Sequence, residues 1–179
     1  MAQTDREALE ALYHATDGPN WEKSTGWDTD VDLSNWYGVT INDQGRVVKL
    51  CLTANNLKGH IPPQLGDLSS LETLDLSWNK LDGSIPPELG DLRELRTLRL
   101  LTNQLTGHIP KELGALSKLD MLNLWNNKLT GPIPPELGEL GALQELVLWG
   151  NELSGPIPNK LGALSELRIL CLYDNELTG

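Results

Sequence analysis

A 24-residue period begins near Val47 and continues to the last residue, Gly179. Its shared pattern is LxxLxLxxNxLxGxIPxxLGxLxx, and the final copy stops after thirteen residues. A period of this length is typical of a solenoid, in which each repeat buries its apolar face against its neighbours. The sequence therefore predicts an extended binding surface rather than a catalytic cavity. The predicted solenoid covers 47–179, with repeats at 47–70, 71–94, 95–118, 119–142 and 143–166 and a partial copy at 167–179.

The alternating leucines of each repeat predict a short strand whose leucines point into the core. Stacked repeats would align these strands as a parallel sheet on one face. An asparagine follows the strand in all six copies, where its amide can satisfy the backbone groups of a turn that has left the sheet. The members of this predicted asparagine ladder are Asn55, Asn79, Asn103, Asn127, Asn151 and Asn175.

The pattern GxIPxxLGxLxxLxxLxLxxNxL resembles the plant-type leucine-rich repeat, and the match covers 47–179. The resemblance implies an α/β leucine-rich-repeat solenoid that forms a right-handed superhelix. Its parallel β-sheet would line the concave face, and 3-10 or helical turns would line the convex face. A second short sheet is expected near the LxGxIP segment.

Residues 1–46 are expected to form a helical N-terminal cap, because the first repeat cannot leave its core open. The sequence TDRE at 4–7 predicts a capping box, and the apolar stripe that follows predicts a helix to about Ala15. Buried tryptophan commonly fills a small cap of this kind. The tryptophans predicted to do so are Trp21, Trp27 and Trp36.

The cap ends with WYGV at 36–39 and GRVV at 45–48, which is similar to the end of plant leucine-rich-repeat caps. Those caps usually carry CxWxGVxC, whereas this chain has Ser34 and Ile41 at the cysteine positions. The missing cap disulfide counts against an extracellular receptor ectodomain. The amino-acid sequence of the cap more closely resembles stramenopile (brown-algal or oomycete) leucine-rich-repeat proteins, some of which are ROCO-type GTPases.

The charge and the cysteines restrict the partners and the compartment. The formal net charge is −11 and no stripe of Lys and Arg is present, which argues against nucleic acid and anionic membranes as partners. No run of 18 apolar residues occurs, so no membrane insertion is expected. Cys51 and Cys171 lie five repeats apart, roughly 24 Å at about 4.8 Å per strand, which is too far for a disulfide. Free thiols and the absence of Asn-x-Ser/Thr sequons favour a reducing, cytoplasmic location.

The sequence lacks the common catalytic signatures, namely a phosphate-binding loop, GxSxG, HExxH and CxxC. His60 and His108 occupy the same repeat position two repeats apart, roughly 10 Å, so they cannot share a metal ion. The acidic segment 28–32 lacks the glycine and the glutamate of a calcium loop. We therefore expect no enzyme activity, no cofactor and no metal site.

The seventh position of the repeat faces outward from the predicted sheet and becomes aromatic towards the end of the chain. Clustered exposed aromatic residues typically mark a recognition surface, although a self-stacking ladder would explain the same column. Asp75 and Arg99 lie on neighbouring strands and predict an ion pair. The predicted ligand-binding residues on the concave face are Trp78, Arg99, Leu101, Met121, Asn123, Trp125, Glu145, Val147, Trp149 and Tyr173.

These patterns predict a non-catalytic recognition module that binds a protein or peptide on its concave face. Three alternatives explain the same patterns: a regulatory segment of a larger signalling enzyme such as a ROCO GTPase or a receptor kinase, a glycan-binding immune-type receptor, and a structural spacer. The uncapped last repeat also predicts end-on self-association. The apolar residues expected at that end are Leu170, Leu172 and Leu177.

Overall fold

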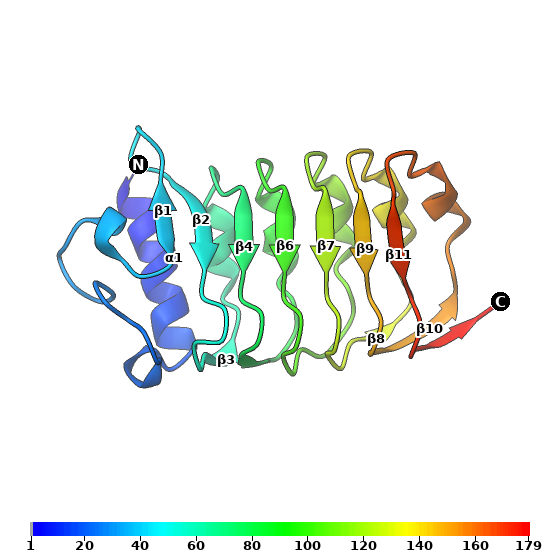
Figure 1. Cartoon of the computed structure of the whole chain (residues 1–179), viewed down its shortest axis with the longest axis horizontal. Coiled ribbons are helices and arrows are strands. Elements are labelled where there is room, and N and C mark those ends of the chain that lie inside the picture. Colours follow the sequence, from blue (N-terminus) through cyan, green and yellow to red (C-terminus); the bar gives the residue numbers. More distant parts are fainter. Residues whose placement is uncertain (1) are drawn as a thin grey trace.

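The structure is a computed structural model that describes residues 2–179 as one elongated stack of turns (Figure 1). Strands line one long face, short helices line the opposite face, and the helix α1 lies at the N-terminal end. The fold is therefore the α/β leucine-rich-repeat solenoid that the sequence predicts.

A seven-stranded sheet forms the concave face, in the order β1-β2-β4-β6-β7-β9-β11. β1 is antiparallel to β2, and the later pairs are parallel. Parallel partners lie 24 residues apart, as do Leu50, Leu74 and Leu98, and these central leucines are fully buried. The strands are β1 (Val39–Ile41), β2 (Val47–Cys51), β4 (Thr73–Asp75), β6 (Thr97–Arg99), β7 (Met121–Asn123), β9 (Glu145–Val147) and β11 (Ile169–Cys171).

Short 3-10 helices form the convex face, and each follows an extended proline. Pro86, for example, has φ −66° and ψ 134° directly before η4. Proline fixes φ near this value and lacks an N–H, so it suits the start of a helix and cannot extend a strand ladder. The helices are η3 (Pro63–Asp67), η4 (Pro87–Asp91), η5 (Lys111–Ala115), η6 (Pro135–Glu139) and η7 (Asn159–Ala163).

A glycine within each of the first four convex helices lets adjacent repeats approach closely. A Cβ added to Gly114 would lie 2.5 Å from the carbonyl oxygen of Glu136 in the next repeat. The same 2.5 Å separation applies to Gly66, Gly90 and Gly138 and the repeats that follow them. Because a real side chain does not fit at that distance, glycine sets the spacing of the convex turns.

A second set of short strands lies near the LxGxIP segments, as the resemblance implied. β3 pairs with β5, and β8, β10 and β12 form a three-stranded sheet. Partners here lie 22 residues apart, as do Lys58 and Lys80, so these strands are staggered by two residues relative to the concave sheet. The strands are β3 (Lys58–His60), β5 (Lys80–Asp82), β8 (Thr130–Gly131), β10 (Glu152–Pro156) and β12 (Glu176–Thr178).

The asparagine amides connect adjacent turns through their backbone groups. Asn127 Nδ2 donates to the carbonyl oxygen of Leu124 in its own repeat at 3.1 Å and to that of Leu100 in the preceding repeat at 3.0 Å. Its Oδ1 accepts from the N–H of Leu105 at 3.1 Å. The same pattern recurs at Asn79, Asn103, Asn151 and Asn175. Each amide therefore satisfies groups that the turn removes from the sheet.

Polar contacts also join the N-terminal segment to the first repeat. Asp5, in α1 (Ala2–Ala15), is fully buried and accepts from Arg46 Nε at 2.9 Å, from Arg46 Nη2 at 2.8 Å and from the N–H of Val47 at 2.9 Å. This hydrogen bonding raises the pKa of the Arg46 guanidinium, which stays charged. The Asn55 amide bonds both the N–H and the carbonyl of Lys23, so the ladder continues into the residues before β2.

The predicted capping box is wrong, because α1 begins at Ala2 and Thr4 lies inside the helix. The Asp5 carboxylate accepts hydrogen bonds from Arg46 instead of capping the helix end. The helix does end at Ala15, and two short helices, η1 (Gly18–Asn20) and η2 (Leu33–Asn35), follow it. The predicted tryptophans are buried in this segment, with their indole N–H groups bonded to backbone carbonyls: Trp21, Trp27 and Trp36.

We expect Asn127→Ala to lower the free energy of unfolding by about 1–3 kcal/mol, because it leaves buried backbone groups unpaired. Lys128→Ala is the matched control, since this neighbour is exposed and should change stability by less than about 0.5 kcal/mol. Equilibrium unfolding in urea measures both values. Equal losses in the two variants would contradict the role given to the amide.

The glycine spacing predicts opposite effects at two equivalent positions. Gly114→Ala should destabilise the chain by about 1–3 kcal/mol through overpacking against Glu136. Gly162, at the same place in η7, has nothing within 4 Å of an added Cβ. Gly162→Ala should therefore be neutral or stabilising by about 0.4–1 kcal/mol. Thermal unfolding compares the two variants, and an equal loss in both would refute close packing as the cause.

Candidate functional site

The strand residues on either side of each buried leucine face outward and form the floor of the concave face. Arg99, Asn123 and Val147 occupy neighbouring rungs in register, and Met121 lies beside Glu145. All five are partly exposed. The sheet therefore brings these predicted site residues together on three adjacent strands, β6, β7 and β9.

Three aromatic side chains form a stacked column directly after β7, β9 and β11. The rings of Trp125 and Trp149 have centroids 4.5 Å apart at an interplanar angle of 24°. The rings of Trp149 and Tyr173 are 4.9 Å apart at 16°. We call Trp125, Trp149 and Tyr173 the aromatic ladder. Because the rings stack on one another, the ladder offers mainly ring edges to a partner, with Tyr173 exposed at its end.

Trp78 extends the ladder from a different repeat position. It follows Ser77 at the eighth position, where the backbone is left-handed in all six repeats. Its φ is 58°, which is uncommon for a bulky residue. The ring is half exposed and meets the Trp125 ring edge-on, with centroids 5.9 Å apart. Trp78 belongs to the second repeat and Trp125 to the fourth, so the Trp78 side chain crosses the third repeat.

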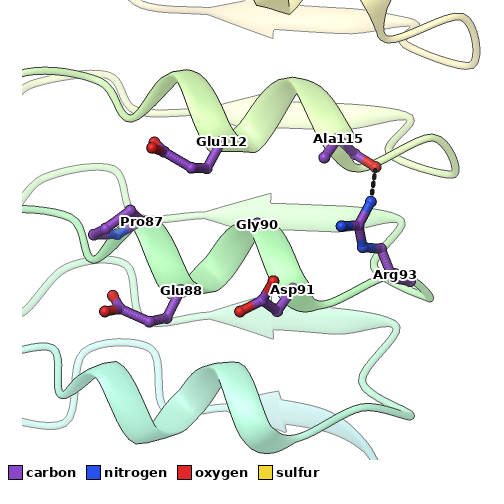
Figure 2. Close-up of a pocket in the computed structure, with 7 residues that line it drawn as sticks. All are labelled: Pro87, Glu88, Gly90, Asp91, Arg93, Glu112 and Ala115. Carbon is purple, nitrogen blue, oxygen red and sulfur yellow. Dashed lines mark hydrogen bonds between the residues drawn. The ribbon is translucent and has the colours of Figure 1, made fainter.

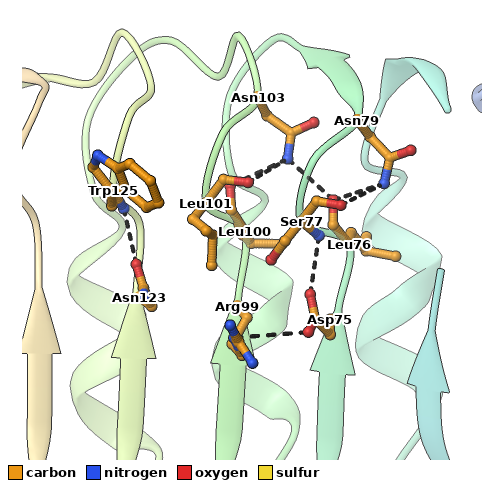
Figure 3. Close-up of polar contacts among 10 residues, drawn as sticks. All are labelled: Asp75, Leu76, Ser77, Asn79, Arg99, Leu100, Leu101, Asn103, Asn123 and Trp125. Atoms are coloured by element: carbon orange, nitrogen blue, oxygen red, sulfur yellow. Dashed lines mark hydrogen bonds and ion pairs between the residues drawn. The ribbon is translucent and has the colours of Figure 1, made fainter. Parts of the chain in front are cut away.

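Leu101 does not form part of the exposed surface, contrary to the sequence prediction. Its exposed fraction is 4%, although the seventh-position residues Thr53, Trp125, Trp149 and Tyr173 are partly or fully exposed. The repeat of Leu101 lies between those of Trp78 and Trp125, whose rings meet across it. Ser77, on the neighbouring turn, is buried to the same degree, with 1% exposed (Figure 3). Sequence position alone could not indicate this cover, because the covering ring comes from another repeat.

Asp75 and Arg99 form the predicted ion pair, with Oδ2 and Nε 3.7 Å apart (Figure 3). Asp75 Oδ1 also accepts from the N–H of Ser77 at 3.0 Å. Asn123 Oδ1 accepts from the N–H of Trp125 at 3.1 Å in the same way. These short side chains fix the turns that carry the seventh-position residues.

A shallow cavity of about 300 Å³ lies on the convex face between η4 and η5 (Figure 2). Its polar lining is acidic, from Glu88, Asp91 and Glu112, and Arg93 closes one end by donating to the carbonyl oxygen of Ala115 at 3.2 Å. The repeat pattern did not indicate this cavity, because its lining comes from two adjacent repeats, with Glu88 and Glu112 at equivalent positions. Among the described residues, no group of three or more His, Cys, Asp or Glu side chains is placed to hold a metal ion.

Both cysteines are free thiols, as predicted, and Cys51 lies at the N-terminal end of the concave sheet. Partial burial of its sulfur raises the pKa of the Cys51 thiol, and the nearby Asp75 carboxylate raises it further. Lys49 and Arg99 act in the opposite direction with smaller effect. Within residues 2–179, no helix has the length and apolar character needed to cross a membrane.

The raised pKa predicts slow alkylation of Cys51. In a Cys171→Ser chain, the iodoacetamide rate should reach half its maximum at a higher pH than in a free cysteine peptide. The sign follows from the thiolate being the nucleophile, so a raised pKa leaves less of it at any given pH below the midpoint. Asp75→Asn should lower the midpoint. A midpoint at or below that of a free cysteine peptide would contradict the assignment.

The chain is similar to a curated plant protein and to several solved structures. A probable leucine-rich repeat receptor-like protein kinase from Arabidopsis thaliana is 39% identical over 74 residues, which are 40% of this chain and 7% of that protein. The crystal structure of a plant ice-binding protein superposes with a TM-score of 0.90 at 36% identity, covering 99% of this chain and 57% of the other.

A further solved structure comes from a receptor. The leucine-rich-repeat ectodomain of the Arabidopsis thaliana receptor kinase GASSHO1/SCHENGEN3, in complex with CASPARIAN STRIP INTEGRITY FACTOR 2, has a TM-score of 0.77 at 36% identity. The match covers 97% of this chain and 24% of that one, so the chain spans less than two thirds of each of these proteins. A model of the leucine-rich repeat region matches residues 44–178, and the chain therefore belongs to the leucine-rich repeat family.

Proposed function

We propose that this chain is a recognition module that binds a protein or peptide across its concave face. The observation that carries the proposal is the partly exposed aromatic ladder, which runs beside a strand floor of mixed polar and apolar residues. Large rigid aromatic side chains dominate the binding energy of many protein interfaces. The similar receptor ectodomain was solved in complex with a partner, and this supports the proposal that the present chain also binds one.

The geometry of the ladder favours a protein partner over a glycan. Sugar rings bind tryptophan by lying flat on a ring face. Here the Trp149 ring is stacked on both sides, and Trp125 and Tyr173 each have one face covered. The ring edges and the indole N–H groups are left for apolar side chains and backbone carbonyls. We therefore rank glycan binding below peptide binding.

Ice binding is a second candidate because of the ice-binding neighbour with a TM-score of 0.90. A lattice is recognised by a regular array of similar groups. The second set of strands carries several hydroxyl side chains, but its two-residue stagger pairs unlike residues at several rungs. Thr130 lies beside Glu152, and His60 lies beside Asp82. Because these charges interrupt a regular array, we rank ice binding by the second set of strands below peptide binding by the concave face. An ice recrystallisation assay on the chain tests ice binding directly.

We also propose that the module is a regulatory segment of a larger signalling protein, since the kinase relative is far longer than the matched segment. The larger protein that we propose is a receptor kinase. A ROCO-type GTPase is the alternative, and it rests only on the resemblance of the cap. Recognition rather than catalysis would then be the task of these repeats. The receptor ectodomain neighbour gives no support to the cytoplasmic location predicted from the sequence.

The concave-face proposal predicts that Trp125→Glu/Trp149→Glu abolishes partner binding while the chain stays folded. The immobilised chain selects binders from a displayed random-peptide library, and biolayer interferometry then measures the dissociation constants. We expect the double variant to bind selected peptides about 30-fold or more weakly, as for loss of an interface hot spot. Circular dichroism confirms folding.

The matched control is Ser117→Glu/Ser165→Glu, which adds the same two charges at exposed positions that precede the strands. It should bind the peptides as the unmodified chain does. Equal binding by all three proteins would refute the aromatic ladder as the site. Equal weakening in both double variants would attribute the loss to net charge instead.

A further inference from the structure

The residue at the eighth repeat position departs from the repeat pattern in one place. The other repeats carry smaller residues there: Ala54, Thr102, Asn126, Gly150 and Asp174. The left-handed backbone is strained for the β-branched Thr102 and for Trp78, and Trp78 is the largest of the six and the only aromatic one among the described repeats. Strain of this kind, on a half-exposed aromatic ring, points to a functional role for the side chain.

Two buried donors on the second and third repeats, which the Trp78 ring spans, lack acceptors. Ser77 Oγ and Arg99 Nε are buried atoms with no hydrogen-bond partner within the described residues. An unsatisfied buried polar group is destabilising, so an acceptor that reached the Ser77 hydroxyl would bind more tightly by pairing it. Leu101, on the next turn, supplies an apolar floor beside the Ser77 hydroxyl (Figure 3).

We propose that Trp78 is a movable cover over a side-chain subsite made by Ser77 and Leu101 on the concave face. The inference rests on the proposed peptide-binding function and names the chemistry that the subsite accepts. When a partner binds, the indole leaves its edge contact with Trp125, and a branched apolar side chain of the partner packs on Leu101. A carbonyl oxygen next to that side chain accepts from the Ser77 hydroxyl.

The charges around the subsite favour a neutral acceptor. The Arg99 guanidinium faces Asp75 at 3.7 Å, and the Asp75 carboxylate lies against the Ser77 turn through its bond to the Ser77 N–H. A carboxylate brought to the Ser77 hydroxyl would meet the like charge of Asp75, and the Arg99 guanidinium is already paired with that Asp75 carboxylate. A peptide amide carbonyl avoids this repulsion. The apolar Leu101 beside it favours a branched apolar side chain, so the occupant is a leucine-like residue of an extended peptide.

The test uses three small probes with similar branched alkyl groups: N-acetyl-L-leucine amide, 4-methylpentanoate and 3-methylbutylamine. Titrations follow the indole N–H signal of Trp125 by NMR. Trp78→Ala removes the cover and keeps the fold, because Ala54 occupies the same left-handed position in the first repeat. Thr102→Ala, at that position in the third repeat, is the matched control.

We expect Trp78→Ala to bind the amide about 2- to 10-fold more tightly than the unmodified chain, because the edge contact with Trp125 no longer competes. Adding Ser77→Ala should remove about 2- to 10-fold of that affinity. Thr102→Ala should match the unmodified chain, and the carboxylate and the amine should bind more weakly than the amide.

The proposal is overturned if Trp78→Ala binds the amide no more tightly than the unmodified chain. It is equally overturned if Ser77→Ala has no effect in the Trp78→Ala background, or if the carboxylate or the amine binds best. No macromolecular partner enters this experiment, so its failure is separate from failure of the peptide selection with the Trp125→Glu/Trp149→Glu variant.

Discussion

The stacking of this solenoid depends on satisfying backbone groups at the turn that follows each concave strand. Asn127 shows how, with one amide that bonds carbonyls in two repeats and accepts an N–H from the preceding repeat. Leucine burial supplies the driving force, but apolar contacts alone would leave these polar groups unpaired at the edge of the core. The amide ladder therefore fixes both the turn and its register with the neighbouring repeat.

The fixed turns place the side chains that we assign to recognition. Because the seventh position recurs every 24 residues in register, three aromatic rings come within stacking distance on successive rungs. The left-handed eighth position then directs Trp78 across the third repeat. The convex glycines act on the other side by letting the backbones of adjacent helices approach closely. Binding surface and core thus follow from one repeated backbone geometry.

Much of the fold was predictable from the sequence, because the repeat has a period that only a stacked architecture satisfies. The buried leucines, the asparagine ladder, the ion pair between Asp75 and Arg99 and the buried tryptophans of the first 46 residues are all present. The prediction of a capping box was wrong because it took into account only contacts within the helix. In the structure Asp5 forms a tertiary contact with Arg46, 41 residues away, and the helix begins before it.

The sequence by itself determined the repeat, the strand face and the column of positions that projects from it, since periodicity specifies which residues point to the core. The tertiary structure alone decided that the ladder rings stack on one another, that Leu101 is buried and that the Ser77 hydroxyl has no hydrogen-bond partner among residues 2–179. The physical reason is that a side chain such as Trp78 reaches beyond its own repeat. Contacts between repeats depend on side-chain length and turn geometry, which a one-repeat pattern does not contain.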